Sequence, residues 1–308
     1  MHPLWLISPF FFWGTAMIVM KAVLPQTAPL FLGAFRLIPA GVLVLLAAVV
    51  MGRSQPRSWR AWGAILLFAL VDGTLFQGFL VTGLARTQAG LGSVMIDSQP
   101  LVVALLAWWL YGETIGLWGW LGLGLGLGGI AMIALPPQEW LHGLDWARIF
   151  GHGEWWMLLA AVAMAVGTVM MRWLSRWVDP LVATGWHMVL GGMPLVLLSG
   201  LTEGTAWVNL DGWGWLGLAY STVLGSAASY GLFFYLAAQG NLTSLSALTF
   251  LTPVFALTFG ALFLGENLTL WQLSGVILTL ISITVINQRQ RFQAPTPVTV
   301  PVSLEPGA

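Results

Sequence analysis

The chain has 308 residues, of which 58% are hydrophobic and only 7% are charged. Soluble domains carry about 25% charged residues, so 11 basic and 11 acidic side chains exclude a water-soluble globular protein of this length. The mean hydropathy of +0.86 indicates that lipid is the main solvent. A net charge of zero excludes an electrostatic nucleic-acid partner. The lack of cysteine excludes disulfides, thiolate metal sites and cysteine nucleophiles.

Apolar stretches that could cross a bilayer follow one another along almost the whole chain. A span needs about 20 apolar helical residues, and charges, prolines and glycines divide the sequence into about ten spans. They lie at 4–24, 29–51, 62–83, 88–111, 115–135, 154–174, 180–200, 213–237, 242–264 and 268–287. The sequence therefore predicts an all-α integral membrane protein with ten transmembrane helices.

The longest polar connection, 136–153, divides the spans into a five-helix unit at 4–135 and a second at 154–287. The remaining residues, 288–308, are polar and Pro-rich, which is typical of a disordered tail. Orientation follows from basic residues in short loops. With both termini in the cytoplasm, seven basic loop residues lie inside and three lie outside. We therefore expect the N-in, C-in topology and a cytoplasmic tail.

The second unit repeats the first at an offset of 153 residues. At this offset Pro100 matches Pro253, Gly112 and Glu113 match Gly265 and Glu266, and Trp118 matches Trp271. Gly14–Thr15 likewise matches Gly167–Thr168, and after a slip of two residues Pro29 and Arg36 match Pro180 and His187. Because each unit holds an odd number of spans, the copies would be inverted. Such repeats place a substrate site near the bilayer midplane.

These motifs carry a family resemblance. Trp13–Gly14 in the first span, Pro29 and Arg36 in the second, and Pro100 before Gly112–Glu113 resemble an EamA repeat of the drug/metabolite transporter superfamily, and the pattern recurs in the second unit. The resemblance covers about residues 5–288 and implies a transporter of ten helices with a central cavity and peripheral fifth and tenth helices. Family members move amino acids, other small metabolites or drugs, usually outward and often with protons. The sequence departs from the family pattern at two positions. His187 stands where the pattern would have a second Arg, and Asp97, three residues before Pro100, stands where the family usually has an apolar or small residue.

Four ionisable side chains fall inside the predicted spans, namely Arg36, Asp72, Asp97 and His187. An ionisable group at bilayer depth is costly unless it faces the protein interior or water, so each is a candidate site residue. Asp72 and Asp97 lie near the middle of adjacent antiparallel spans, where both could face one cavity and carry a proton. The alternative is structural, with either Asp in a buried salt bridge to Arg36 or hydrogen-bonded to a neighbouring helix.

Arg36 and His187 also have two interpretations each. The planar guanidinium of Arg36 could bind a substrate carboxylate, but it could equally bind helix carbonyls or an Asp side chain. Because the Arg is part of the family motif, a scaffold or gating contact is as plausible as contact with substrate. His187 could titrate in the physiological range, or it could bridge two helices through hydrogen bonds. Glu113 and Glu266 end their spans at matched positions, which favours a structural task such as capping the following helix.

Aromatic and amide side chains complete the candidate pocket. Tyr230 matches Gln77 in the repeat, so the two would lie at equivalent depth, and Trp13 lies at the centre of the first span. An aromatic wall with a few polar groups suits amphipathic or aromatic solutes. Plain helix packing explains the same residues.

The sequence thus predicts a secondary transporter of small metabolites, either amino acids or amphipathic organic solutes, that exports by alternating access with proton coupling as one option. The alternatives are an uncoupled facilitator, an intramembrane aspartyl-type enzyme built on Asp72 and Asp97, and a receptor or assembly factor. We expect no enzymatic activity, no cofactor and no metal. The expected partners are a small-molecule substrate and the lipid bilayer, and a homodimer is compatible with this interpretation. The expected location is a bacterial cell membrane.

Overall fold

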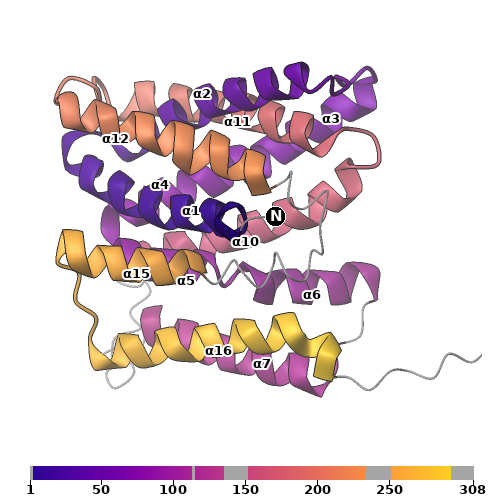
Figure 1. Cartoon of the computed structure of the whole chain (residues 1–308), viewed down its shortest axis with the longest axis vertical. Coiled ribbons are helices and arrows are strands. Elements are labelled where there is room, and N and C mark those ends of the chain that lie inside the picture. The colour runs from indigo at the N-terminus through magenta and orange to yellow at the C-terminus, as the bar shows by residue number, and fades with distance from the viewer. Residues whose placement is uncertain (1–2, 113–114, 135–151, 234–250, 293–308) are drawn as a thin grey trace, which may run out of the picture.

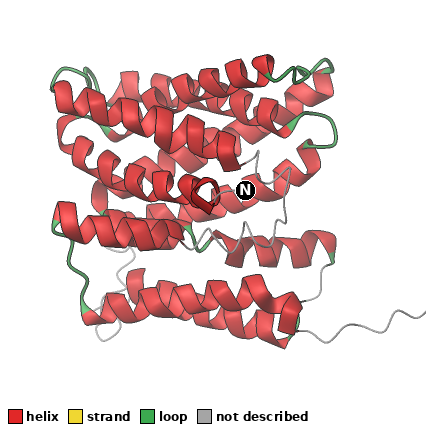
Figure 2. Cartoon of the chain, viewed as in Figure 1, coloured by secondary structure: helices red, strands yellow, loops and turns green. Residues whose placement is uncertain are grey.

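The computed structural model describes residues 3–112, 115–134, 152–233 and 251–292. Every regular element in these residues is a helix (Figure 2). The elements are α1 (Pro3–Val23), η1 (Leu24–Gln26), α2 (Pro29–Val50), α3 (Trp59–Phe68), η2 (Ala69–Leu75), α4 (Phe76–Arg86), α5 (Ala89–Ile96), α6 (Gln99–Tyr111), α7 (Leu117–Ala134), α10 (Gly153–Leu174), α11 (Pro180–Thr202), α12 (Gly212–Thr222), η3 (Val223–Ala228), α15 (Leu251–Leu264) and α16 (Leu270–Phe292).

Six helical stretches are long and apolar enough to cross a membrane. They are Ile7–Gln26, Pro29–Val50, Trp59–Arg86, Ala89–Leu110, Gly153–Met171 and Pro180–Thr202. Three shorter apolar helices, Leu117–Ile133, Leu251–Leu264 and Leu270–Val285, account for further predicted spans. The end of the eighth span, the start of the ninth, most of the 136–153 connection and most of the 288–308 tail lie outside the described residues. These helices make the chain an integral membrane protein. The number of ten transmembrane helices stays a prediction.

The helices stack in layers across the long axis of the molecule (Figure 1). The α2 and α11 helices pair at one end of the stack, and α7 and α16 pair at the other (Figure 1). Large apolar side chains on the outer face of α2 are exposed, including Leu46, Val49 and Val50. Such a face is suited to contact with lipid, whose tails are as apolar as these side chains.

The paired helices that match in the repeat run antiparallel. Residues after the end of α2 contact the start of α11, and Glu203, after the end of α11, binds the start of α2. In the other pair, Ser282 of α16 donates to the carbonyl of Gly122 in α7, whereas Gly275 lies against Gly129. We use "first half" for residues 3–134 and "second half" for residues 152–292.

Among the described residues, the third, fourth and eighth predicted spans are not continuous α-helices. The third contains the π-helix η2, whose counterpart η3 occupies the matched position in the second half. π-Helical turns are rare and occur frequently at functional sites. The fourth span breaks at Asp97 and Ser98, between α5 and α6. Pro100 explains the break, because proline has no N–H and is tolerated only in the first turn of the new helix.

Glycine ends two matched helices in the left-handed region. Gly112 after α6 and Gly265 after α15 both have φ of +64°. Only glycine adopts this conformation readily, and it is the usual residue just past a helix C-terminus. The repeat seen in the sequence therefore corresponds to matched local geometry.

Candidate functional site

The intramembrane polar residues gather where the two halves meet. Arg36 of α2 donates from Nη1 to the Ser226 hydroxyl of η3 over 3.0 Å. It also donates from Nη2 to the Gln77 side-chain carbonyl of α4. Arg36, Gln77 and Ser226 are all buried. We call Trp13, Arg36, Asp72, Gln77, His187, Ser226 and Tyr230 the interface cluster.

Asp72 pairs with His187 rather than with Arg36. His187 Nε2 of α11 lies 3.2 Å from Asp72 Oδ2 of η2, and both side chains are buried. The Phe68 ring lies over the imidazole, with the ring centroids 4.5 Å apart. Of the two structural alternatives for Asp72, the contact lies with a neighbouring helix, at His187, and not with Arg36. The interpretation of His187 as a bridge between two helices agrees with this contact.

Close backbone contact fixes η2 against α11. A Cβ added to Gly73 would lie 2.8 Å from the Cα of Gly191, so only glycine fits at this crossing. Thr74 donates its hydroxyl to the Gly191 carbonyl over 2.8 Å. On the other side of Asp72, a Cβ on Gly167 of α10 would overlap the carboxylate. Small residues thus let α10 and α11 approach η2 closely at Asp72, as is common between membrane helices.

Aromatic side chains form the adjoining part of the cluster. The Trp13 and Tyr230 rings meet edge to face with centroids 5.3 Å apart, and Trp13 also contacts Phe233 at 5.4 Å. The Tyr230 phenol is hydrogen-bonded to Gln77, which links the aromatic group to Arg36. Trp13, Gln77 and Tyr230 are thus linked in one set of contacts, and their role as walls of a pocket stays a prediction.

Asp97 has a different environment. It follows the end of α5, is partly buried, and accepts a hydrogen bond from Ser93 of the same helix over 3.2 Å. Two residues later, Gln99 donates to Thr168 of α10 over 3.1 Å. Gln99 and Asp72 therefore both contact α10 near Gly167–Thr168, whereas Asp97 itself is hydrogen-bonded within its own helix.

One end of the bundle, on the left in Figure 1, is joined by carboxylates of the second half. Glu203 accepts from Leu30 N and Phe31 N at 2.8 and 2.9 Å, at the start of α2. Glu266 accepts from Ala89 N and Gly90 N at 2.6 and 3.0 Å, at the start of α5. Both acids therefore cap helices of the first half. The contact of Glu266 is a structural one, as expected, but the helix that it caps is α5 of the first half and not the following helix. Glu113 lies outside the described residues.

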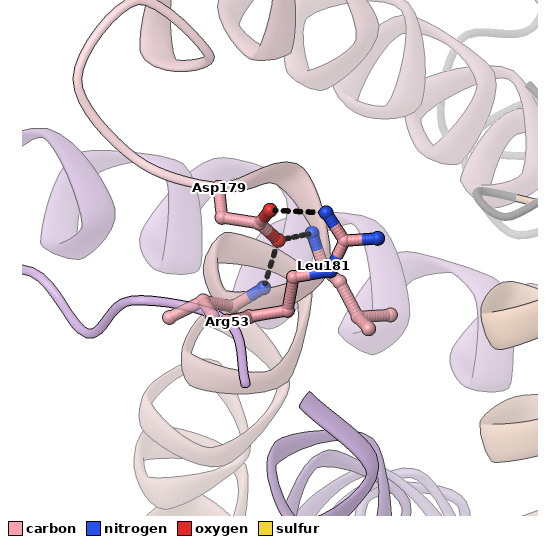
Figure 3. A network of polar contacts seen from close by, with 4 residues as sticks. Arg53, Asp179 and Leu181 are labelled. Atoms are coloured by element: carbon pink, nitrogen blue, oxygen red, sulfur yellow. Dashed lines mark hydrogen bonds and ion pairs between the residues drawn. The ribbon is translucent and has the colours of Figure 1, made fainter. Parts of the chain in front are cut away.

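The opposite end holds a weaker link (Figure 3). Asp179 caps α11 by accepting from Leu181 N over 2.9 Å, and Arg53 lies 3.4 Å from its other oxygen. The Arg53 side chain is 44% exposed. Exposed pairs of this kind contribute little to stability, about 1 kcal/mol or less.

The grooves of the described surface lie away from the cluster. One of about 330 Å³ runs between α1 and α12, lined by residues such as Val23 and Trp213. Another of about 280 Å³ lies between α2 and α11 beside Trp186. Neither is lined by a member of the interface cluster. The polar groups of the cluster are instead held closed by contacts with one another.

Comparison with known proteins identifies the family. The sequence model of the EamA-like transporter family matches residues 2–135 and again 151–288. The chain belongs to the EamA-like transporter family. It is therefore a drug/metabolite transporter superfamily member, as the sequence motifs predict, and a membrane transporter of small solutes.

Individual proteins that are similar to this chain agree with the family assignment. It is 58% identical to the protein named uncharacterized transporter sll0355 of Synechocystis sp., over 94% of this chain and 90% of that one. It is 53% identical to a chloroplastic WAT1-related protein of Arabidopsis thaliana, over 92% of this chain and 68% of that one. A protein of known crystal structure shares the fold with a TM-score of 0.66 and 18% identity, over 94% of this chain and 98% of that one. Names of relatives thus favour transport over catalysis.

Proposed function

We propose that this EamA-like protein is a secondary transporter that exports small amphipathic metabolites, amino acids included, by alternating access. The observation that carries the proposal is that contacts of the interface cluster cross between the halves. Arg36 binds Ser226, Asp72 binds His187, and Trp13 contacts Tyr230. A rocking motion of one half against the other would break these contacts and expose the same polar groups.

Inversion of the repeat supports the same mechanism. Matched helices pack antiparallel, matched positions carry η2 and η3, and the family model matches each half separately. Two inverted units of five helices, at 4–135 and 154–287, with both termini in the cytoplasm, account for these features. In this topology the end that Glu203 and Glu266 join faces outward. The proposed location is a bacterial cell membrane.

Proton coupling would reside in the Asp72–His187 pair. The pair holds one acid and one base in contact at 3.2 Å, buried between the halves. A proton that neutralises the carboxylate would remove its attraction for His187 and weaken a link between the halves. Asp97 is the second candidate carrier, because its carboxylate is at a helix break with one hydrogen-bond donor, Ser93.

The test is solute flux in proteoliposomes under an imposed pH gradient, with a mixed panel of amino acids and organic metabolites. Asp72→Asn and Asp97→Asn are measured beside wild type. We expect at least one solute to accumulate against its gradient, and one of the two variants to lose accumulation while it retains exchange. Flux that ignores the pH gradient in all three proteins would instead indicate a facilitator. No flux of any solute, above protein-free liposomes, would refute transport of the panel.

A further inference from the structure

Arg36 is a buried cation whose recorded partners are neutral. Arg36 is only 4% exposed. Its guanidinium donates two hydrogen bonds, one to the Ser226 hydroxyl and one to the Gln77 side-chain amide oxygen. Among the described residues, no carboxylate forms an ion pair with it. Asp72, the buried acid of the same cluster, is paired with His187.

An unneutralised charge is costly in this environment. Taking a charged group out of water costs several kcal/mol even after the protein relaxes, and neutral hydrogen bonds return only part of that cost. Membrane proteins therefore pair buried arginines with an anion or with water. The described protein residues supply no such anion to Arg36, so a bound solute is the natural source.

Unused hydrogen-bond donors lie in the same network. Arg36 Nε and Trp13 Nε1 are buried, and neither has a hydrogen-bond partner among the residues that the structure describes. Both are donors only, because a guanidinium and an indole carry no acceptor. The network therefore lacks acceptor oxygens and negative charge, which together describe a carboxylate.

The surroundings of these donors are aromatic. Trp13 contacts Phe10, Tyr230 and Phe233, with ring centroids 5.3 to 5.8 Å apart. Tyr230 joins this wall to Arg36 through Gln77. A solute with its carboxylate at Arg36 would place its remaining atoms against apolar and aromatic surface.

We propose that Arg36 and the Trp13 wall form a binding site for organic monoanions, namely carboxylates with an apolar or aromatic body. The inference rests on the proposed transport function and narrows its substrate class. Arg36 Nε donates to the carboxylate, the Trp13 ring packs on the body of the solute, and the Trp13 N–H binds a polar substituent. Access opens when the halves separate, because the Arg36–Ser226 bond crosses between them. A cation would be repelled by Arg36, and a neutral solute would leave its charge uncompensated.

The test measures equilibrium binding to the purified full chain with matched pairs of probes. The pairs are acetate and acetamide, benzoate and benzamide, and phenylacetate and phenylacetamide, which differ in charge but little in shape. Binding is followed by tryptophan fluorescence and by the shift of the thermal unfolding midpoint. The variants are Arg36→Gln, Arg36→Lys and Trp13→Phe. Arg53→Gln is the matched control, since it removes an arginine outside the cluster.

We expect the aromatic carboxylates to bind wild type and Arg53→Gln more tightly than their amides. In Arg36→Gln the affinity for benzoate should fall about tenfold or more, as expected for lost bonds to a charged group. Its unfolding midpoint without ligand should not fall, because an uncompensated buried charge is removed. Arg36→Lys should retain part of the preference for anions, and Trp13→Phe should weaken aromatic probes less than Arg36→Gln.

Two outcomes would overturn the inference. One is that no carboxylate binds wild type better than its amide. The other is that Arg36→Gln folds and keeps the wild-type preference. If Arg36→Gln does not fold, the inference is still tested by the affinities of wild type and Arg36→Lys for each carboxylate and its amide. Because binding needs no flux, carboxylate binding without flux of the metabolite panel refutes transport alone, whereas flux without carboxylate preference refutes this inference alone.

Discussion

The contact of Glu266 with the start of α5 should control how easily the end of the bundle that Glu203 and Glu266 join opens. Its carboxylate accepts from Ala89 N at 2.6 Å and Gly90 N at 3.0 Å, two donors that have no partner within their own helix. Removing a helix N-cap costs about 0.5–2 kcal/mol, and loss of a charge at the helix N-terminus adds about 0.3–1 kcal/mol. Glu266→Ala should therefore weaken the closed state by about 2 kcal/mol, or about thirty-fold in population.

Spin labels can report this change, because the natural chain has no cysteine to remove. Ala85→Cys and Leu270→Cys place labels on exposed residues near the contact, one in each half. Double electron–electron resonance between them should show a longer-distance population in Glu266→Ala that is small or absent with Glu266 present. The control is Asp211→Ala, which removes the side-chain N-cap of α12 at Gly214 N. The substitution retains the backbone N–H of Asp211, which donates to Gln26 of the first half, so no side-chain contact of Asp211 between the halves is lost.

Equal distance distributions in Glu266→Ala and the parent would refute the reasoning. An equal change in Asp211→Ala would also refute it, because the effect would then reflect general loss of stability. The distinction depends on the position of each acid. Glu266 crosses from the second half to the first, whereas Asp211 and Gly214 are in one helix end.

Further predictions concern packing, the surface pair and coupling. Gly191→Ala would place a Cβ against the η2 backbone and should lower stability by about 1–3 kcal/mol in detergent unfolding, whereas Gly200→Ala, in open space on the same helix, should raise it by about 0.5–1 kcal/mol. A Gly191→Ala protein as stable as wild type would contradict the close crossing. Arg53→Gln should change the free energy of unfolding by less than about 1 kcal/mol, because its pair with Asp179 is exposed. His187→Gln should retain solute exchange but lose accumulation driven by a pH gradient, and unchanged accumulation would exclude His187 from coupling.

Some of this architecture could be predicted from periodicity and repeats. Composition predicts a membrane protein, and the match of Gly112 with Gly265 predicts equivalent helix ends, which share φ of +64°. The repeat matches Gln77 with Tyr230, and the two side chains are hydrogen-bonded in the structure, with Trp13 against Tyr230. These features depend on local sequence or on the duplication, so sequence contains their signal.

Other features depend on which helices meet, which one sequence does not reveal. Nothing in the sequence singles out Ser226, yet it accepts a hydrogen bond from Arg36. The partner of Asp72 proved to be His187, because η2 lies against α11 at Gly73 and Gly191. The signal that could have identified this pair is the coincidence of one buried acid and one buried base in matched halves.

The most direct test of alternating access at the interface cluster is the accessibility of one cysteine from each side of the membrane. Ala227→Cys introduces a small thiol directly after Ser226, at a partly buried position of η3. Oriented vesicles receive a membrane-impermeant thiol reagent on one side or the other. The account predicts modification from both sides, at rates that fall when a transported solute is present. Modification from only one side, under every solute and pH condition, would contradict alternating access at this site.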